Sequence, residues 1–142
     1  MSSNESLKAL TPKQAYQLTQ ENPSALLVDV RSDMEFLMIG HPKGAMHVPW
    51  IDEPDWNINP DFVKEVRRLL LGRVSGEASA NAPVILICRS GNRSEDAGKA
   101  LVEDGLTDVY VIREGFEGPL DENHHRGTIC GWRFDGLPWE QV

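Results

Sequence analysis

The chain has 142 residues, of which 25% are charged and 40% hydrophobic, a balance typical of a globular protein. This length is sufficient for one hydrophobic core, so we expect a single domain over residues 1–142. The net charge of -8 and the pI near 4.9 argue against a nucleic-acid partner, because no basic surface is available to neutralise phosphates.

The N-terminal sequence and the cysteine content bear on the compartment. Residues 1–10 lack the basic start and long apolar run of a secretory signal, and no apolar stretch approaches the length that spans a membrane. Two cysteines, Cys88 and Cys130, provide no disulfide framework. We therefore expect a cytoplasmic protein with no membrane partner.

The first twenty residues predict a strand followed by a helix. Residues 7–10 favour a short edge strand. Thr11 then offers a hydroxyl N-cap, Pro12 suits the first helical position, and Gln14 completes the spacing of a capping box. We expect this helix to run to about Glu21.

An apolar run over residues 25–30 predicts a second strand, buried on both faces, which carries one polar residue, Asp29. After it, Ser32 and Glu35 repeat the capping-box spacing and predict a short helix that ends by Gly40. The residues that follow predict a turn-rich connection.

The middle of the chain predicts a helix between two loops. Residues 50–59 form a loop rich in Pro, Asp and Trp. Asn59-Pro60 then caps a helix whose apolar positions recur every three or four residues and which ends at Gly72. Residues 74–82 are small and polar, and they predict a flexible loop too short to link two domains.

The stretch from Val84 to Ser94 carries the clearest chemical signal. Its apolar run, residues 84–87, predicts a central strand that ends at Cys88, where open α/β sheets place their ligands. A polar loop then leads into a helix at Ser94, whose free N–H groups and positive dipole end favour an anion. Arg89 and Arg93 add positive charge, so the loop favours a nucleophilic thiolate. The alternative is a cysteine that merely ends a buried strand. A buried structural thiol, however, does not need two arginines beside it.

The remaining elements complete an alternating pattern. Residues 94–104 predict a helix with Gly105 as its C-cap, and residues 109–112 predict a last strand. Strands that alternate with helices predict parallel βαβ units. We therefore expect an α/β fold: a doubly wound open sheet of about five mostly parallel strands, with helices on both faces.

Four motifs in order resemble those of the rhodanese (sulfurtransferase) family, over residues 26–138. The family usually has isoleucine and proline where this chain has Pro42-Lys43. The motifs are Asp29-Val30-Arg31 with Glu35-Phe36, the segment Gly40-His41-Pro42-Lys43-Gly44-Ala45, the Cys88 loop with Arg93 five positions on, and the tail Trp132-Arg133-Phe134-Asp135-Gly136-Leu137-Pro138.

The resemblance implies a rhodanese-like fold and sulfur transfer. The Cys88 thiolate is expected to take the outer sulfur of a small anionic donor such as thiosulfate, and to pass it from a persulfide to cyanide, a thiol or a protein acceptor. The substrate-binding residues are expected to be Arg89, Ser90, Gly91, Asn92, Arg93 and Ser94. Asp29, Arg31 and Glu35 are expected to form a hydrogen-bonded framework that supports these substrate-binding residues.

We expect neither a cofactor nor a metal ion. His41 and His47 are more typical of structural histidines, because the sequence places no further ligands at usable spacing.

An insertion at about residues 116–131 separates the last strand from the tail, where the family usually has only a few residues. It follows a strand and therefore emerges at the edge that carries Cys88, so we predict that it overhangs the cysteine loop and narrows the pocket. The alternative is a solvated excursion. A metal site of His124, His125 and Cys130 lacks a fourth ligand.

Two other functions compete with sulfur transfer. A cysteine phosphatase or arsenate reductase also uses a cysteine, an anion-binding loop and an arginine, but its loop usually has one more residue than lies between Cys88 and Arg93. A non-catalytic regulatory or interaction module of the same family usually lacks the cysteine, which is present here.

Overall fold

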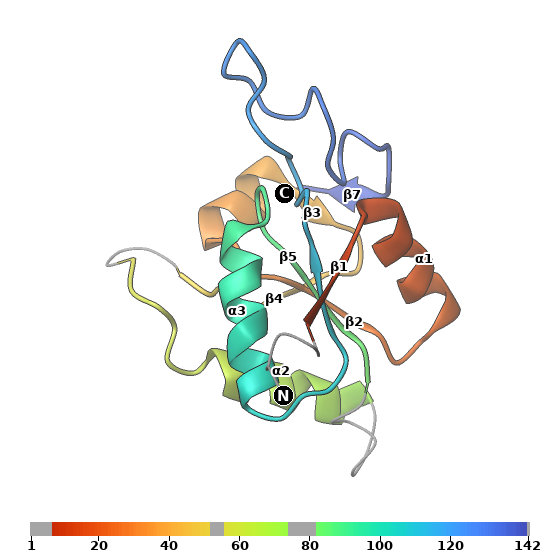
Figure 1. Cartoon of the computed structure of the whole chain (residues 1–142), viewed down its shortest axis with the longest axis vertical. Coiled ribbons are helices and arrows are strands. Elements are labelled where there is room, and N and C mark those ends of the chain that lie inside the picture. The colour runs from red at the N-terminus through yellow and green to blue at the C-terminus, as the bar shows by residue number, and fades with distance from the viewer. Residues whose placement is uncertain (1–6, 52–55, 74–81, 142) are drawn as a thin grey trace.

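A five-stranded parallel sheet forms the centre of the computed structural model, which describes residues 7–51, 56–73 and 82–141 (Figure 1). The strand order is β1 (Leu7–Leu10), β6 (Val109–Ile112), β5 (Val84–Ile87), β2 (Leu26–Asp29) and β4 (Met46–His47). The central strand β5 pairs Leu86 with Val28 on one side and with Val111 on the other. The predicted α/β sheet is therefore confirmed, and all of its strand pairs are parallel.

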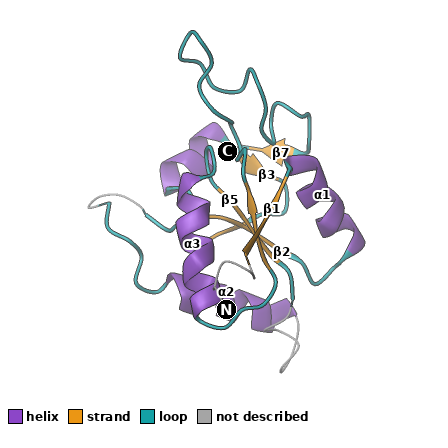
Figure 2. Cartoon of the chain, viewed as in Figure 1, coloured by secondary structure: helices purple, strands orange, loops and turns teal. Residues whose placement is uncertain are grey.

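Helices cover both faces of this sheet (Figure 2). On one face, α2 (Phe62–Arg73) and α3 (Asn92–Glu103) bury a cluster of apolar side chains against the strands. On the other face, α1 (Pro12–Glu21) packs together with residues of the C-terminal tail, including Phe116 and Trp132. A short π-helix, η2 (Glu35–Ile39), lies at the carboxyl edge of the sheet.

The start of α1 follows the predicted capping box. The Thr11 Oγ1 atom accepts a hydrogen bond from the Gln14 backbone N–H at 3.2 Å, and the Gln14 side chain accepts one from the Thr11 N–H at 3.0 Å. Two N–H groups that the helix leaves without partners are satisfied in this way.

Three short strands were not predicted from the sequence. One is the sheet strand β4, and the other two are β3 (His41–Pro42) and β7 (Trp139–Glu140), which form a separate antiparallel pair. Each has only two residues, so it shows no alternation of apolar and polar side chains. These strands depend on pairing with distant parts of the chain.

Two helix boundaries also differ from the prediction. The helix α2 continues through Gly72 to Arg73, and the polar loop predicted beyond it lies outside the described residues over 74–81. The helix α3 begins at Asn92, two residues before the predicted Ser94. Gly91 is its N-cap at φ 112°, a conformation that glycine adopts readily, and this lets the helix start earlier. Within the described ranges, no helix has the length and apolar character needed to cross a bilayer.

Candidate active site

Cys88 directly follows β5 at the carboxyl edge of the sheet, and only 1% of it is exposed. Its Sγ atom accepts a hydrogen bond from the Gly91 backbone N–H at 3.0 Å and lies 3.5 Å from the Ser94 hydroxyl. The Ser94 hydroxyl in turn donates to the Gly91 carbonyl at 3.0 Å. The sulfur atom therefore faces a backbone N–H donor at the N-terminus of α3.

Gly91 closes the cysteine loop. A Cβ atom at this position would clash with the carbonyl oxygen of Arg113, at the end of β6. The loop can therefore fold this tightly against its neighbour only if the residue has no side chain.

Arg93 braces the loop against η2 rather than pointing at the sulfur. Its two terminal nitrogens donate to the two carboxylate oxygens of Glu35, at 2.6 and 2.9 Å. The Ser32 N–H and hydroxyl also donate to Glu35, at 3.3 and 3.1 Å. Burial alone would raise the pKa of Glu35, but the Arg93 hydrogen bond and charge, with the Ser32 hydrogen bonds, outweigh it and lower the pKa to about 2. The hydrogen bond that Arg93 donates to Glu35 likewise raises the pKa of Arg93.

This pair predicts a pH-dependent loss of stability in Glu35→Gln. Because the pKa of Glu35 is about 2 in the folded state against an ordinary 4.5, its carboxylate stabilises the fold above about pH 4.5, and this contribution disappears as the pH falls through about 2. Urea unfolding of the variant and the wild type should differ by about 1–2 kcal/mol at neutral pH, allowing for partial solvent screening, and the difference should shrink below about pH 4.5.

The control for this experiment is Glu95→Gln. Glu95 is exposed and lies 3.9 Å from Lys99, so its loss should change the free energy of unfolding little at any pH. A Glu35→Gln difference that stays constant down to about pH 2 would contradict the role assigned to this carboxylate.

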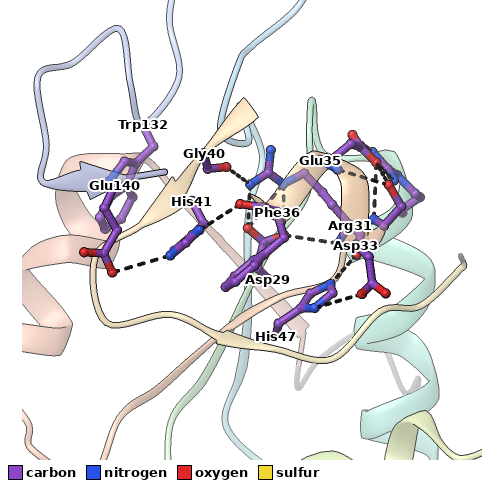
Figure 3. A network of polar contacts seen from close by, with 12 residues as sticks. Asp29, Arg31, Asp33, Glu35, Phe36, Gly40, His41, His47, Trp132 and Glu140 are labelled. Atoms are coloured by element: carbon purple, nitrogen blue, oxygen red, sulfur yellow. Dashed lines mark hydrogen bonds and ion pairs between the residues drawn. The ribbon is translucent and has the colours of Figure 1, made fainter. Parts of the chain in front are cut away.

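A second ion pair lies completely buried beside the first (Figure 3). The Arg31 guanidinium donates to both carboxylate oxygens of Asp29, at 2.9 Å from Nε and 2.7 Å from Nη2, and Nη2 also donates to the Gly40 carbonyl. The same guanidinium packs 4.6 Å from the centre of the Phe116 ring. Glu35 does not join this pair: the expected framework divides into Asp29–Arg31 and Glu35–Arg93.

The two histidines hold η2 in place. Their rings lie nearly parallel to the Phe36 ring, with centroid distances of 3.8 Å for His41 and 4.4 Å for His47, and Figure 3 shows Phe36 between them. One nitrogen of His41 faces the Phe36 carbonyl at 2.8 Å, and one of His47 faces the Arg31 carbonyl at 2.7 Å. Across the described ranges, no three His, Cys, Asp or Glu side chains are grouped to hold a metal ion.

The other loop residues face two different hollows. Arg89 and Arg93 line a groove bounded by η2 and the loop that precedes α2. Ser90, Gly91 and Asn92 line another, between β1 and α3. The structure therefore does not gather all the predicted substrate-binding side chains on one side of Cys88.

The base of the insertion is attached to the cysteine loop through its backbone. The Phe116 N–H donates to the Cys88 carbonyl at 2.8 Å, and the Glu117 and Gly118 N–H groups donate to the Arg89 carbonyl at 3.0 and 3.1 Å. Sequence reasoning missed this contact, since backbone donors leave no residue-type signal.

Beyond its base, the insertion projects past the end of the sheet (Figure 1), and it lines neither of the two hollows beside the cysteine loop. Its outer turn is held by Asp121, which accepts hydrogen bonds from the His125 N–H at 2.9 Å and the Thr128 hydroxyl at 2.6 Å. Burial and the nearby Glu114 carboxylate raise the pKa of the Cys130 thiol, which keeps it protonated and a poor nucleophile.

Comparison with known proteins places these residues in a family. The family model of the rhodanese-like domain matches residues 11–121. The thiosulfate sulfurtransferase GlpE of Haemophilus influenzae is 32% identical over 113 residues, which cover 80% of this chain and 88% of that protein.

Two solved structures are similar in fold. The crystal structure of Rv0390 from M. tuberculosis has 39% sequence identity and a TM-score of 0.79, with 95% of this chain and 98% of that chain covered. The polysulfide-sulfur transferase homodimer from Wolinella succinogenes has 26% identity and a TM-score of 0.60, with 99% and 82% covered.

Proposed function

Since the chain belongs to the rhodanese-like domain family, we propose that it is a sulfurtransferase that moves a sulfane sulfur from an anionic donor such as thiosulfate to a thiophilic acceptor, through a persulfide on Cys88. The observation that carries this proposal is the environment of the sulfur. Cys88 Sγ lies at the start of the loop into α3 and accepts the Gly91 N–H, so a negative charge on it is stabilised.

The two half-reactions need no external oxidant or reductant. The Cys88 thiolate attacks the outer sulfur of thiosulfate, a Cys88 S–S bond forms, and sulfite leaves with the electron pair of the broken bond. Cyanide or a thiolate then attacks the outer sulfur of the persulfide, and the electron pair of the broken bond returns to Cys88.

The two arginines of the loop have different roles in this proposal. Arg93 is engaged by Glu35 and holds the loop in shape. Arg89 is exposed, and its guanidinium has no ion-pair or hydrogen-bond partner among the described residues, so its charge is available to the anionic donor. Because Cys88 must remain a free thiol, we expect the protein to work in a reducing compartment such as the cytoplasm.

Initial-rate kinetics with thiosulfate and cyanide both varied test the proposal. A persulfide intermediate predicts ping-pong behaviour, with parallel lines in double-reciprocal plots and equal amounts of sulfite and thiocyanate. The parallel assay is hydrolysis of an aryl phosphate, where no phosphate release is expected. Phosphate release without thiocyanate formation would instead favour the cysteine phosphatase, and activity in neither assay would favour the non-catalytic module.

A further inference from the structure

The groove beside the cysteine loop has walls of mixed character. It encloses about 470 Å³ between η2, the loop that precedes α2 and the cysteine loop. This volume is in the range of small-molecule sites. Its walls carry three large apolar side chains and three charged ones: Met34, Ile51, Trp56, Glu35, Arg89 and Arg93.

Trp56 is held in this groove in an unfavourable conformation. Its φ is 57°, in the left-handed region that a bulky aromatic residue rarely adopts, and 56% of it is exposed. An antiparallel bridge between Ile51 and Ile58 joins the chain on either side of Trp56. The Asn59 N–H also donates a hydrogen bond to the Trp50 carbonyl, at 2.7 Å. The fold therefore strains a backbone position to present an indole that it does not bury, which is typical of a functional site.

Among the residues that the structure describes, the charges of the groove leave one cation without an ion-pair partner. Glu35 and Arg93 neutralise each other through their two hydrogen bonds. Arg89 has no such partner in the described ranges. A ligand that matches the groove therefore has one anionic group and an apolar body, which can cover Trp56 and Met34.

We propose that this groove is the acceptor site, and that it selects small thiols with an apolar body and an anionic group. This inference rests on the proposed function. An inorganic donor such as thiosulfate leaves the apolar walls uncovered, whereas an organic thiol buries them as its sulfur approaches the cysteine loop.

The transfer to such a thiol balances without a further reactant. The acceptor thiolate attacks the outer sulfur of the Cys88 persulfide, and a new S–S bond forms. The bond from Cys88 Sγ to that sulfur breaks, its electron pair remains on Cys88 as the thiolate, and the acceptor leaves as a persulfide.

Three thiols test the selection, each with thiosulfate as donor and with cyanide as the reference acceptor. Mercaptohexanoate has both the chain and the charge, mercaptoacetate has the charge without the chain, and mercaptohexanol has the chain without the charge. We expect kcat/KM to be about tenfold higher for mercaptohexanoate than for mercaptoacetate. A smaller, few-fold advantage over mercaptohexanol is expected, because the Arg89 charge is exposed to solvent.

Trp56→Gly removes the indole and relieves the positive φ. We expect the ratio of kcat/KM for mercaptohexanoate to that for cyanide to fall about tenfold, through KM rather than kcat. The thermal midpoint should stay equal or rise, since glycine accepts this conformation. The matched control is Ile58→Ala: Ile58 belongs to the same loop and is also 56% exposed, but it does not line the groove, so the ratio should not change.

Each result decides the inference. Transfer to cyanide with equal kcat/KM for the three thiols would overturn the acceptor site and leave the proposed function intact, whereas no transfer to any acceptor would overturn both. A lower thermal midpoint in Trp56→Gly would show that the indole supports the fold, which also contradicts the inference. Failure of Trp56→Gly to fold would contradict the inference in the same way. Met34→Ser then tests the apolar wall separately, and its control is Met38→Ser, because Met38 is also exposed but does not line the groove.

Discussion

Cys88→Ser should lose sulfur transfer from thiosulfate by at least about a thousandfold, the scale of losses seen when a catalytic nucleophile is removed. A serine hydroxyl fits the space of the thiol and can still accept the Gly91 N–H, but it does not form a persulfide. Cys88 is buried at the end of β5, and within the described part of the chain its Sγ atom makes polar contacts only with Gly91 and Ser94, so the fold should be retained.

The matched control is Cys130→Ser. This second thiol has a raised pKa, from burial and from the nearby Glu114 carboxylate, and is therefore not expected to act as a nucleophile. Its variant should keep most of the wild-type turnover in the thiosulfate–cyanide assay. If Cys88→Ser kept more than a few per cent of the turnover, Cys88 would not be the nucleophile. A large loss in Cys130→Ser would indicate transfer between two thiols.

Arg31→Met should reduce the free energy of unfolding by about 3–5 kcal/mol, a large share of the stability of a small domain. The guanidinium of Arg31 and the carboxylate of Asp29 are both fully buried. Methionine fills much of the volume, but it leaves the Asp29 charge without a partner and the Gly40 carbonyl without its donor. Urea denaturation at neutral pH measures this cost.

An exposed ion pair supplies the comparison. Arg67 hydrogen-bonds the Asp104 carboxylate across α2 and α3, and both side chains are about a third or more exposed. Arg67→Met should therefore cost only about 0–1 kcal/mol. Asp29→Asn combined with Arg31→Met should recover part of the loss, because it removes the orphaned charge. Equal small costs for Arg31→Met and Arg67→Met would contradict the importance of the buried pair.

Much of the fold is predictable because its strands and helices carry local signals. The apolar runs at residues 26–29 and 84–87 are buried on both faces, as parallel strands require, and Thr11 with Gln14 caps α1 through groups that are adjacent in the sequence.

The rest depends on contacts between distant residues. Glu35 and Arg93 are 58 positions apart, and no local pattern indicates that this carboxylate pairs with the loop arginine instead of with Arg31. The φ of Trp56 is set by the closure of its loop, and the N–H groups of the insertion base bind carbonyls that any residue provides. These features depend on contacts that form only in the folded chain, so the local sequence does not predict them.

The most direct test of the proposed mechanism is mass spectrometry of the protein after incubation with thiosulfate, followed by proteolysis without reductant. We expect one sulfur atom to be added to the peptide that contains Cys88, cyanide to remove it, and Cys88→Ser not to acquire it. A sulfur atom on Cys130 instead, or an unmodified Cys88 in protein that still produces thiocyanate, would contradict the Cys88 persulfide.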